Sequence, residues 1–349
     1  IISTGTSSGK SMCYALPALD RLLKDADSCS LFLFPTKALT YDQLNNLKFI
    51  APKQLHGAIS VYDGDTPSHL RSTIRKNARI LLTNPDMLHL GILPHHTNWA
   101  NFFNNLCLVV LDEIHIYRGV FGSHIANVIR RLKRIANFYG SQPQFILTSA
   151  TIANPLEFGS RLTGFDFKLI NSDGAPHGTK HWVMYNPPVV NKELGIRKSA
   201  LSESTRFCKD LFAYDLQTLL FTGTRPAAEQ ALKILQEQLP GESKRLFSYR
   251  SGYLPVERRH IEQALKNGTA RIVTATNALE LGIDIGSMQA VVISGYPGTI
   301  AATRQQSGRA GRKSESSIAI LVASANPLDQ FLAHHPDYFF ERTPEQALI

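Results

Sequence analysis

Residues 4–11 combine small side chains with a lysine and a hydroxyl group, in the order of a phosphate-binding loop. A short apolar segment precedes the loop, and a helix is predicted from Met12 to Leu23. In such a unit, backbone N–H groups turn inward and bind phosphate oxygens. The strict pattern has glycine at position 4, where this chain has threonine. The groups expected at the phosphates are those of Thr6, Ser7, Ser8, Gly9, Lys10 and Ser11.

Two pairs of residues could carry out the chemistry. The Lys10 ammonium places a positive charge beside the β- and γ-phosphates, and the Ser11 hydroxyl can coordinate Mg²⁺. Asp112 and Glu113 follow four apolar residues, as at the end of a buried strand. One carboxylate can hold Mg²⁺ through water, and the other can accept a proton from the attacking water. Together the two pairs predict an enzyme that hydrolyses a nucleoside triphosphate.

These groups need a scaffold that brings the phosphate loop and the carboxylates together. Apolar strands, polar turns and helices alternate through the first half of the chain, and the carboxyl ends of parallel strands meet at one edge of a sheet. The functional groups are therefore expected to gather at that edge. The predicted strands of this first sheet are 30–34, 58–62, 79–82, 106–111 and 145–147.

A second alternating series predicts a second α/β domain, without a phosphate loop of its own. Its strands are expected at 218–221, 246–248, 271–274, 290–293 and 318–322, with helices at 227–238 and 256–266. Residues rich in Gly, Pro, Asn and Lys separate the two series. The predicted organisation is a first domain at 1–170, a linker at 171–198 with the strand that enters the second domain at 181–185, and a second domain at 199–349.

Composition indicates a globular protein with a polyanionic partner. The chain has 349 residues, enough for two cores, with 43% hydrophobic and 19% charged residues. No apolar run approaches the ~20 residues of a membrane span. The net charge is +9 and the pI about 9.4, as expected of a protein that binds nucleic acid. One helix carries Arg130, Arg131, Lys133 and Arg134, which we expect to form a solvated basic face.

Four scattered cysteines, Cys13, Cys29, Cys107 and Cys208, form no CxxC pair. This spacing predicts a reducing compartment, the cytoplasm, and no zinc site within these residues. The paired histidines at 95–96 and 334–335 lack carboxylate or cysteine partners at the spacing of metal ligands.

The motifs, taken in order, resemble a known family. Residues 112–115 read Asp-Glu-Ile-His, a DExH box, and the further blocks are Pro35-Thr36, Thr83-Asn84-Pro85, Ser149-Ala150-Thr151, residues 276–284 (TNALELGID) and 305–312 (QQSGRAGR). The series resembles a superfamily 2 DExH (DEAD/DEAH-box-like) helicase core. Residues 115–124 and 249–255 are similar, more narrowly, to the mitomycin-repair, YprA-like helicases. The resemblance implies two tandem RecA-like domains with the ATP site in the cleft between them.

The resemblance also implies a role for each residue of the ATP site. Lys10 and Ser11 would bind the triphosphate and Mg²⁺, Asp112 the metal, and Glu113 would act as general base. In the second domain, Arg309 and Arg312 match arginine fingers, which neutralise charge on the γ-phosphate in the transition state. Two further positions match residues that contact the nucleotide, Gly282 and Asp284.

Nucleic acid is expected on the opposite face of the domains, where the family holds it. The residue types there suit contacts with the sugar-phosphate backbone, and no set of side chains is arranged to read base edges. The expected contacts are Pro35, Thr36, Thr83, Asn84, Pro85, Thr222, Gly223, Arg250 and Thr276. The residues expected to couple nucleotide state to this surface are His115, Ser149, Thr151 and Gln305.

The leading hypothesis is an ATP-dependent 3′→5′ DNA helicase that acts in DNA repair. Alternatives are a motor subunit of a restriction or remodelling complex that moves on duplex, an RNA helicase, and a non-hydrolysing scaffold. The intact Lys10, Asp112, Glu113, Arg309 and Arg312 argue against the scaffold.

Three expectations concern segments outside the chain. The glutamine motif that reads adenine should lie before Ile1, which leaves the choice among nucleoside triphosphates open. Zinc-binding and other accessory domains are expected outside the chain, and the strand-separating wedge is expected among them. By itself the chain should show weak nucleic-acid-stimulated ATPase activity and little unwinding.

Overall fold

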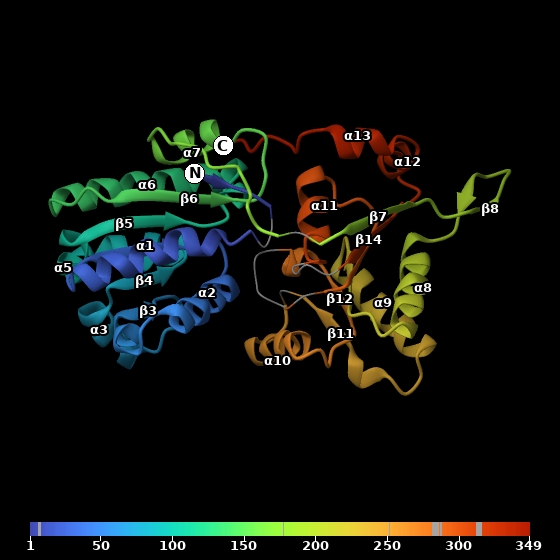
Figure 1. Cartoon of the computed structure of the whole chain (residues 1–349), viewed down its shortest axis with the longest axis horizontal. Helices are drawn as coiled ribbons and strands as arrows, with labels where there is room; N and C mark the ends of the chain where they lie inside the picture. The colour runs from blue at the N-terminus through green and yellow to red at the C-terminus, as the bar shows by residue number, and fades with distance from the viewer. Residues whose placement is uncertain (6–7, 177, 251, 281–285, 287, 312–315) are drawn as a thin grey trace. The chain divides into compact units, whose positions relative to one another are not determined.

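The computed structural model describes residues 1–5, 8–176, 178–250, 252–280, 286, 288–311 and 316–349, which form two compact units (Figure 1). The first unit contains residues 8–173 together with residues 1–4 and 346–349, and the second contains residues 174–345. The predicted domain boundaries differ from these units in two places. The sequence predicts a linker from residue 171, whereas the first unit continues to Asp173, and it assigns the last four residues to the second domain. Those four residues instead pack on the first unit, where Asn154 binds both the amide and the carbonyl of Ala347.

The first unit is built on a sheet of six parallel strands, in the spatial order β1-β6-β5-β2-β4-β3. Both faces of its central strands are covered, so these strands read as nearly continuous apolar runs, of the kind expected for a buried parallel sheet. The strands are β1 (Ile2–Ser3), β2 (Cys29–Leu33), β3 (Ile59–Val61), β4 (Ile80–Thr83), β5 (Leu106–Leu111) and β6 (Gln144–Ser149).

Helices cover the two faces of this sheet with separate apolar cores. Because side chains alternate along a strand, Leu31 and Leu33 of β2 face one core while Phe32 faces the other. The core of Phe32 is closed by α1 (Lys10–Lys24) and α2 (Lys37–Ile50). The opposite core is closed by α5 (Ala100–Asn104), α6 (Gly119–Phe138) and α7 (Pro155–Thr163). Helices α3 (Ser68–Asn77) and α4 (Pro85–Met87) also belong to the first unit.

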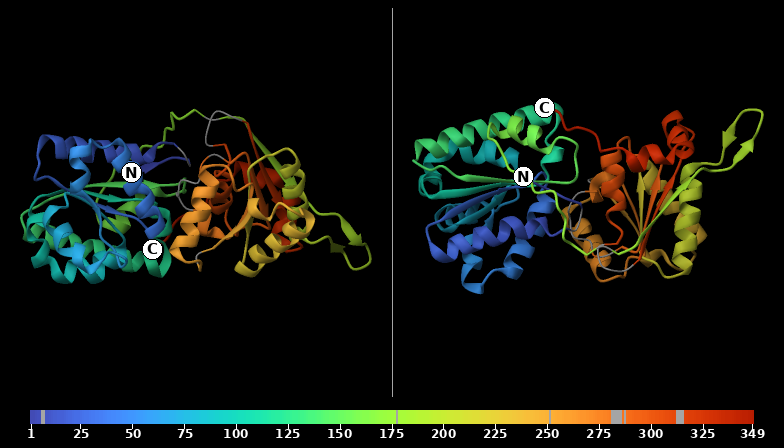
Figure 2. Two further views of the ribbon diagram at one scale, coloured as in Figure 1. Left: turned by 90° about the horizontal axis from the view of Figure 1, so that it is seen from below. Right: turned by 45° about the horizontal axis from the view of Figure 1, so that its top comes forward.

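The second unit has a parallel sheet of its own (Figure 2). Its six strands lie in the order β11-β12-β10-β13-β14-β7. The strand expected to enter the domain is present as β7, paired in parallel with β14 at one edge. The strands are β7 (Lys180–Tyr185), β10 (Thr218–Thr222), β11 (Leu246–Tyr249), β12 (Ile272–Ala275), β13 (Ala290–Ser294) and β14 (Ser317–Val322). Two parallel sheets flanked by helices confirm the predicted fold class.

Helices also flank the second sheet. Apolar residues of α8 and α9 pack with Leu220, Val292 and Ile320 in the core of one face. Trp182 and Met184 of β7 pack with Leu332 and Phe339 in a smaller cluster. The helices are α8 (Ala200–Ala213), α9 (Arg225–Gln238), α10 (Pro255–Lys266), α11 (Ile300–Ser307), α12 (Pro327–His334) and α13 (Pro336–Glu341).

A small hairpin was not predicted. Strands β8 (Val189–Asn191) and β9 (Ile196–Arg197) pair antiparallel and extend away from the sheet of the second unit (Figures 1 and 2). Its turn is made by Asn191, whose side chain accepts a hydrogen bond from the Leu194 amide, and by Gly195 at φ +63°. The segment read as a linker therefore contains three strands.

Candidate nucleotide-binding site

The phosphate loop lies between β1 and α1, as predicted. Gly9 directly precedes the helix at φ +78°, in the left-handed region that glycine adopts without strain. The Thr4 hydroxyl lies 2.6 Å from the Ser8 hydroxyl, and Lys10 Nζ donates to the Thr4 carbonyl at 2.9 Å. The threonine that replaces the pattern's glycine thus has a local role, since it ties the two sides of the loop together. Thr6 and Ser7 lie outside the described residues.

Asp112 lies at the carboxyl end of β5 and is 5% exposed. Three donors hold its carboxylate: the Glu113 amide and the Thr148 hydroxyl bind Oδ1, and the Tyr14 hydroxyl binds Oδ2 at 3.2 Å. Burial, and then the charge of Glu113, raise the pKa of Asp112 to about 6, while Lys10 and the hydrogen bonds lower it. The carboxylate therefore sits within the electrostatic reach of the loop lysine, as a site for a metal–triphosphate complex requires.

Glu113 adopts a strained backbone conformation. Its φ of 52° and ψ of 48° place a non-glycine residue in the left-handed region, which is uncommon and often marks functional sites. Glu113 follows the metal-binding candidate Asp112 directly, and its backbone amide donates to Asp112 Oδ1 at 2.9 Å. Of two adjacent carboxylates, one can hold a metal and the other can accept a proton from water.

His115 belongs to the same cluster, and 10% of its side chain is exposed. Its Nδ1 accepts a hydrogen bond from the Ala150 amide at 3.3 Å, which joins the DExH segment to the segment after β6. Burial, reinforced by the charge of Lys10, lowers the pKa of His115 to about 3. Ser149 is fully buried, with no hydrogen-bond partner for its hydroxyl among the residues that the structure describes, and Thr151 is exposed. The structure thus brings His115, Ser149 and Thr151 to one edge of the sheet.

The donor set of the first unit suits Mg²⁺. Ser11 supplies a hydroxyl and Asp112 a carboxylate, both hard oxygen ligands of the kind that Mg²⁺ prefers. A cation would also offset the cost of burying an ionised Asp112. Within the described ranges, no group of three or more His, Cys, Asp or Glu side chains could by itself hold a metal. Such a site would be completed by phosphate oxygens and water.

Of the two predicted arginine fingers, Arg309 lies among the described residues, and it is buried in the second unit. Arg309 is 1% exposed, and its Nη2 donates to the Glu280 carbonyl at 2.7 Å. Gln306 Nε2 binds the Glu280 carboxylate at 2.9 Å, and Gln305 is buried nearby in sequence on α11. Three other predicted site residues, Gly282, Asp284 and Arg312, lie outside the described residues.

The expected nucleic-acid contacts in the first unit lie at the end of a strand or just after it. Thr36 caps α2, where its hydroxyl accepts from the Leu39 amide at 3.3 Å, and Pro35 precedes it. Asn84 caps α4 in the same way through the Met87 amide at 2.8 Å, followed by Pro85. Thr83 differs, because its buried hydroxyl donates to the Tyr62 carbonyl at 2.6 Å and is used inside the sheet.

In the second unit, Thr222 ends β10, Gly223 follows it and Thr276 follows β12, so the topology places them at one edge of the sheet. Arg250 follows β11 at the same edge. Its Nε donates to the Glu229 carboxylate at 2.8 Å and its guanidinium lies over the Tyr253 ring. The Arg250 guanidinium, which is expected to bind a phosphate of the nucleic acid, is therefore ion-paired with the Glu229 carboxylate.

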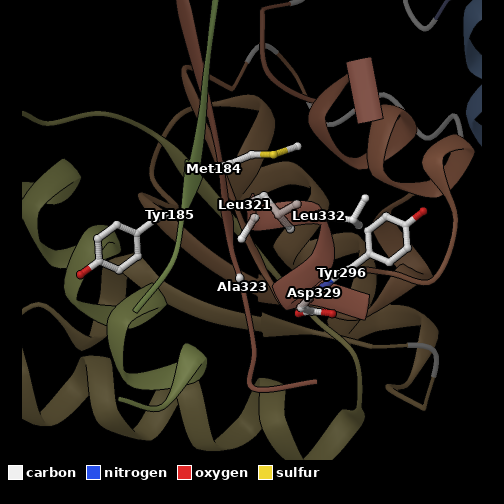
Figure 3. Close-up of a pocket in the computed structure, with 8 residues that line it drawn as sticks. Met184, Tyr185, Tyr296, Leu321, Ala323, Asp329 and Leu332 are labelled. Carbon is white, nitrogen blue, oxygen red and sulfur yellow. Dashed lines mark hydrogen bonds between the residues drawn. The ribbon is translucent and has the colours of Figure 1, made fainter. Parts of the chain in front are cut away.

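The second unit also contains a small pocket, lined by Met184, Tyr185, Tyr296, Leu321 and Asp329 among others (Figure 3). Its volume of about 10 Å³ is at the lower limit of the space that one water molecule needs. The Asp329 carboxylate accepts from the Tyr296 and Ser324 amides, at 3.1 and 2.7 Å. Both the size and these contacts indicate a packing feature. Among the described helices, none has the length and apolar character needed to cross a membrane.

Sequence reasoning missed two residues of the candidate site, Tyr14 and Thr148. Both hydroxyls bind Asp112. The sequence could have indicated Tyr14, because it lies four residues after Lys10 and so on the same face of the predicted helix. It indicated Thr148 more weakly, only as the residue before the Ser-Ala-Thr block.

Comparison with known proteins agrees with this geometry. The DEAD/DEAH box helicase family model matches residues 1–158, and the helicase conserved C-terminal domain matches residues 203–314. The ATP-dependent helicase YprA of Bacillus subtilis is 51% identical over 99% of this chain and 47% of its own length. The ATP-dependent helicase HRQ1 of Saccharomyces cerevisiae is 43% identical over 98% of this chain and 33% of its own.

Among solved structures, the DUF1998 helicase MrfA bound to DNA matches with a TM-score of 0.94 and 50% identity, over 99% of this chain and 47% of the MrfA chain. The chain thus spans about half the length of MrfA and YprA, and a third of HRQ1. Residues 1–158 therefore carry a DEAD/DEAH box helicase domain and residues 203–314 a helicase conserved C-terminal domain, and the chain resembles the YprA-like helicases.

Proposed function

We propose that this chain is the motor of an ATP-dependent DNA helicase. The observation that carries the proposal is the buried Asp112 carboxylate, held by three donors and influenced by the charge of Lys10. This is the arrangement needed to bind a metal–triphosphate complex. Glu113, beside it, is the proposed general base. A bound Mg²⁺ would polarise the terminal phosphate and neutralise its charge.

The proposed substrate is single-stranded or tailed duplex DNA, approached through the sugar-phosphate backbone. The net charge of +9 and the loop residues after the strands support a polyanionic partner. The relative MrfA was solved with DNA, which favours DNA over RNA. From the resemblance of the motifs to the mitomycin-repair, YprA-like helicases we further propose 3′→5′ movement and a role in DNA repair. The free thiols of Cys13, Cys29, Cys107 and Cys208 suit the reducing cytoplasm as its location.

The remaining site residues keep the roles proposed from the family. Arg309 and Arg312 would neutralise the γ-phosphate in the transition state, and Gly282 and Asp284 would contact the nucleotide. His115, Ser149, Thr151 and Gln305 would couple nucleotide state to DNA binding. A motor that moves on duplex and an RNA helicase would use the same ATP site, so the nucleic acid that stimulates hydrolysis decides among the three.

The test is ATPase activity with single-stranded DNA, blunt duplex DNA, single-stranded RNA and no nucleic acid. The helicase proposal expects single-stranded DNA to stimulate hydrolysis most strongly. Stimulation by blunt duplex alone would support the duplex motor, and stimulation by RNA alone would support the RNA helicase. Lys10→Ala is the control, because it removes the cation at the phosphates and should abolish hydrolysis with every nucleic acid.

A further inference from the structure

The side chain of Tyr14 lies at the centre of the contacts around Asp112. It is 2% exposed, and its ring packs edge-on against Phe32 of β2, with 5.3 Å between ring centroids. Its hydroxyl is 3.2 Å from Asp112 Oδ2 and 3.2 Å from Gln43 Oε1. Packing fixes the ring, so the hydroxyl is held at a set position beside the carboxylate.

Each oxygen of Asp112 has its own donor. Oδ1 receives the Glu113 amide and the Thr148 hydroxyl, whereas Oδ2 receives the Tyr14 hydroxyl. Removing the Tyr14 hydroxyl would leave Oδ2 without that donor and would free the carboxylate to rotate about its own bond. A buried carboxylate with fewer donors is also more costly to ionise.

Tyr14 also lies beside a second helix. Gln43 lies on α2, which begins directly after Thr36, and its Oε1 is a second acceptor for the one proton of the Tyr14 hydroxyl. Ser11, the other candidate metal ligand, lies three residues before Tyr14 on α1. The phenol therefore lies between Asp112 and the helix behind a loop proposed to contact DNA.

We propose that Tyr14 is a positioning residue, which orients the Asp112 carboxylate for the divalent cation that accompanies the nucleotide. The inference rests on the proposed function, because it assigns the cation to this site. Ser11 and Asp112 supply the hard oxygen ligands that such a cation needs. Tyr14 itself does not touch the cation. It acts through the orientation of Asp112.

The test uses Tyr14→Phe, which keeps the ring against Phe32 and removes only the hydroxyl. Binding of a fluorescent ATP analogue is measured in EDTA and during a Mg²⁺ titration. In EDTA, we expect an affinity within about two-fold of wild type. The Mg²⁺ concentration at half-saturation should rise at least about five-fold, which corresponds to about 1 kcal/mol, the usual contribution of one hydrogen bond. Excess Mg²⁺ should restore binding.

Two further variants separate positioning from general damage. Thr148→Val removes one of the two donors on Oδ1 with little change in shape and should also raise the Mg²⁺ requirement. The matched control is Tyr185→Phe, because the Tyr185 hydroxyl likewise binds a buried carboxylate, that of Glu203 at 2.7 Å, in the second unit. This control should keep the wild-type Mg²⁺ requirement, and thermal unfolding should show that all three variants are folded.

The outcomes distinguish this inference from the proposed function. An unchanged Mg²⁺ requirement in Tyr14→Phe, or an equal loss of affinity with and without Mg²⁺, would overturn the positioning role. If DNA fails to stimulate hydrolysis by the wild type while the Tyr14→Phe shift is observed, the helicase proposal fails and the positioning role stands. A wild type whose nucleotide affinity is independent of Mg²⁺ would overturn both.

Discussion

The Ala150 amide donates to Nδ1 of His115 at 3.3 Å, so this nitrogen carries no proton and the ring is neutral. The same Nδ1 lies 3.5 Å from Glu113 Oε2, a distance typical of an ion pair. Burial, however, lowers the pKa of His115 to about 3, so the contact joins a carboxylate to a neutral imidazole. At neutral pH, His115 therefore contributes no charge, and its role depends on where its ring nitrogens lie.

The first prediction concerns the pH dependence of stability. His115 binds a proton in the unfolded chain below about pH 6.5. In the folded chain it does so only near pH 3. Between these values the unfolded state holds one more proton, so acidification weakens folding by about 1.4 kcal/mol per pH unit. The variant His115→Gln has no imidazole and therefore lacks this pH-dependent loss of stability. From pH 7.5 to 5, the wild type should lose about 2 kcal/mol more free energy of unfolding than the variant.

Asp112 changes the free energy of unfolding in the opposite direction, so its effect must be separated from that of His115. Its pKa is raised to about 6, so the folded state binds its proton first and gains stability as the pH falls from about 6 towards 3.8. This term is common to wild type and His115→Gln and cancels in their difference. Denaturant unfolding at each pH gives both free energies. Parallel pH profiles for the two proteins would contradict a neutral His115.

A second prediction separates ATP binding from hydrolysis at Glu113. Glu113→Gln keeps the size of the side chain and removes the base, so ATP should bind with near wild-type affinity and turnover should stop. The bound ATP should hold the protein on DNA. The measurements are nucleotide affinity, steady-state ATPase activity and DNA dissociation rate. Near-normal turnover would remove the general-base assignment.

A third prediction concerns Arg309, whose buried guanidinium donates to the Glu280 carbonyl. Arg309→Ala should lower kcat by about 10³-fold, the scale at which arginine fingers act, and leave ATP affinity within a few-fold. Because the side chain is buried, thermal unfolding must be measured as well. Arg309→Lys is the companion variant, since it keeps a positive charge but loses the planar fork. A loss of affinity with unchanged kcat would make Arg309 a ground-state ligand.

Much of the ATP site could be predicted because its signals are local in sequence. Lys10 and Ser11 follow a loop of small residues, and Asp112 and Glu113 follow an apolar strand. Parallel topology then places their elements at one sheet edge. The Tyr14–Asp112 hydrogen bond joins residues 98 positions apart and depends on how one ring packs against Phe32. No periodicity encodes such a contact.

Surface charge was also only partly predictable. Lys133 belongs to the helix face expected to be solvated, yet its Nζ donates to the Thr163 carbonyl at 2.8 Å and lies 3.6 Å from the centroid of the Phe165 ring. The carbonyl belongs to the last turn of α7, where unpaired acceptors attract cations. The sequence shows that α6 carries Lys133, but it does not show that this side chain contacts the C-terminal end of α7.

The last prediction concerns Arg250, whose proposed contact with phosphate competes with its ion pair to Glu229. Arg250→Ala should weaken binding of single-stranded DNA of any sequence and reduce the slope of log K against log salt by about 0.7, the value for one phosphate contact. Glu229→Gln should strengthen binding a few-fold, because it releases the guanidinium. The same change in the Arg250→Ala background should have no effect. Arg245→Ala removes an arginine that is also ion-paired, with Asp215 and Glu242, and serves as the control. If Arg245→Ala and Arg250→Ala change the salt dependence equally, the effect is one of net charge, and Arg250 makes no specific contact.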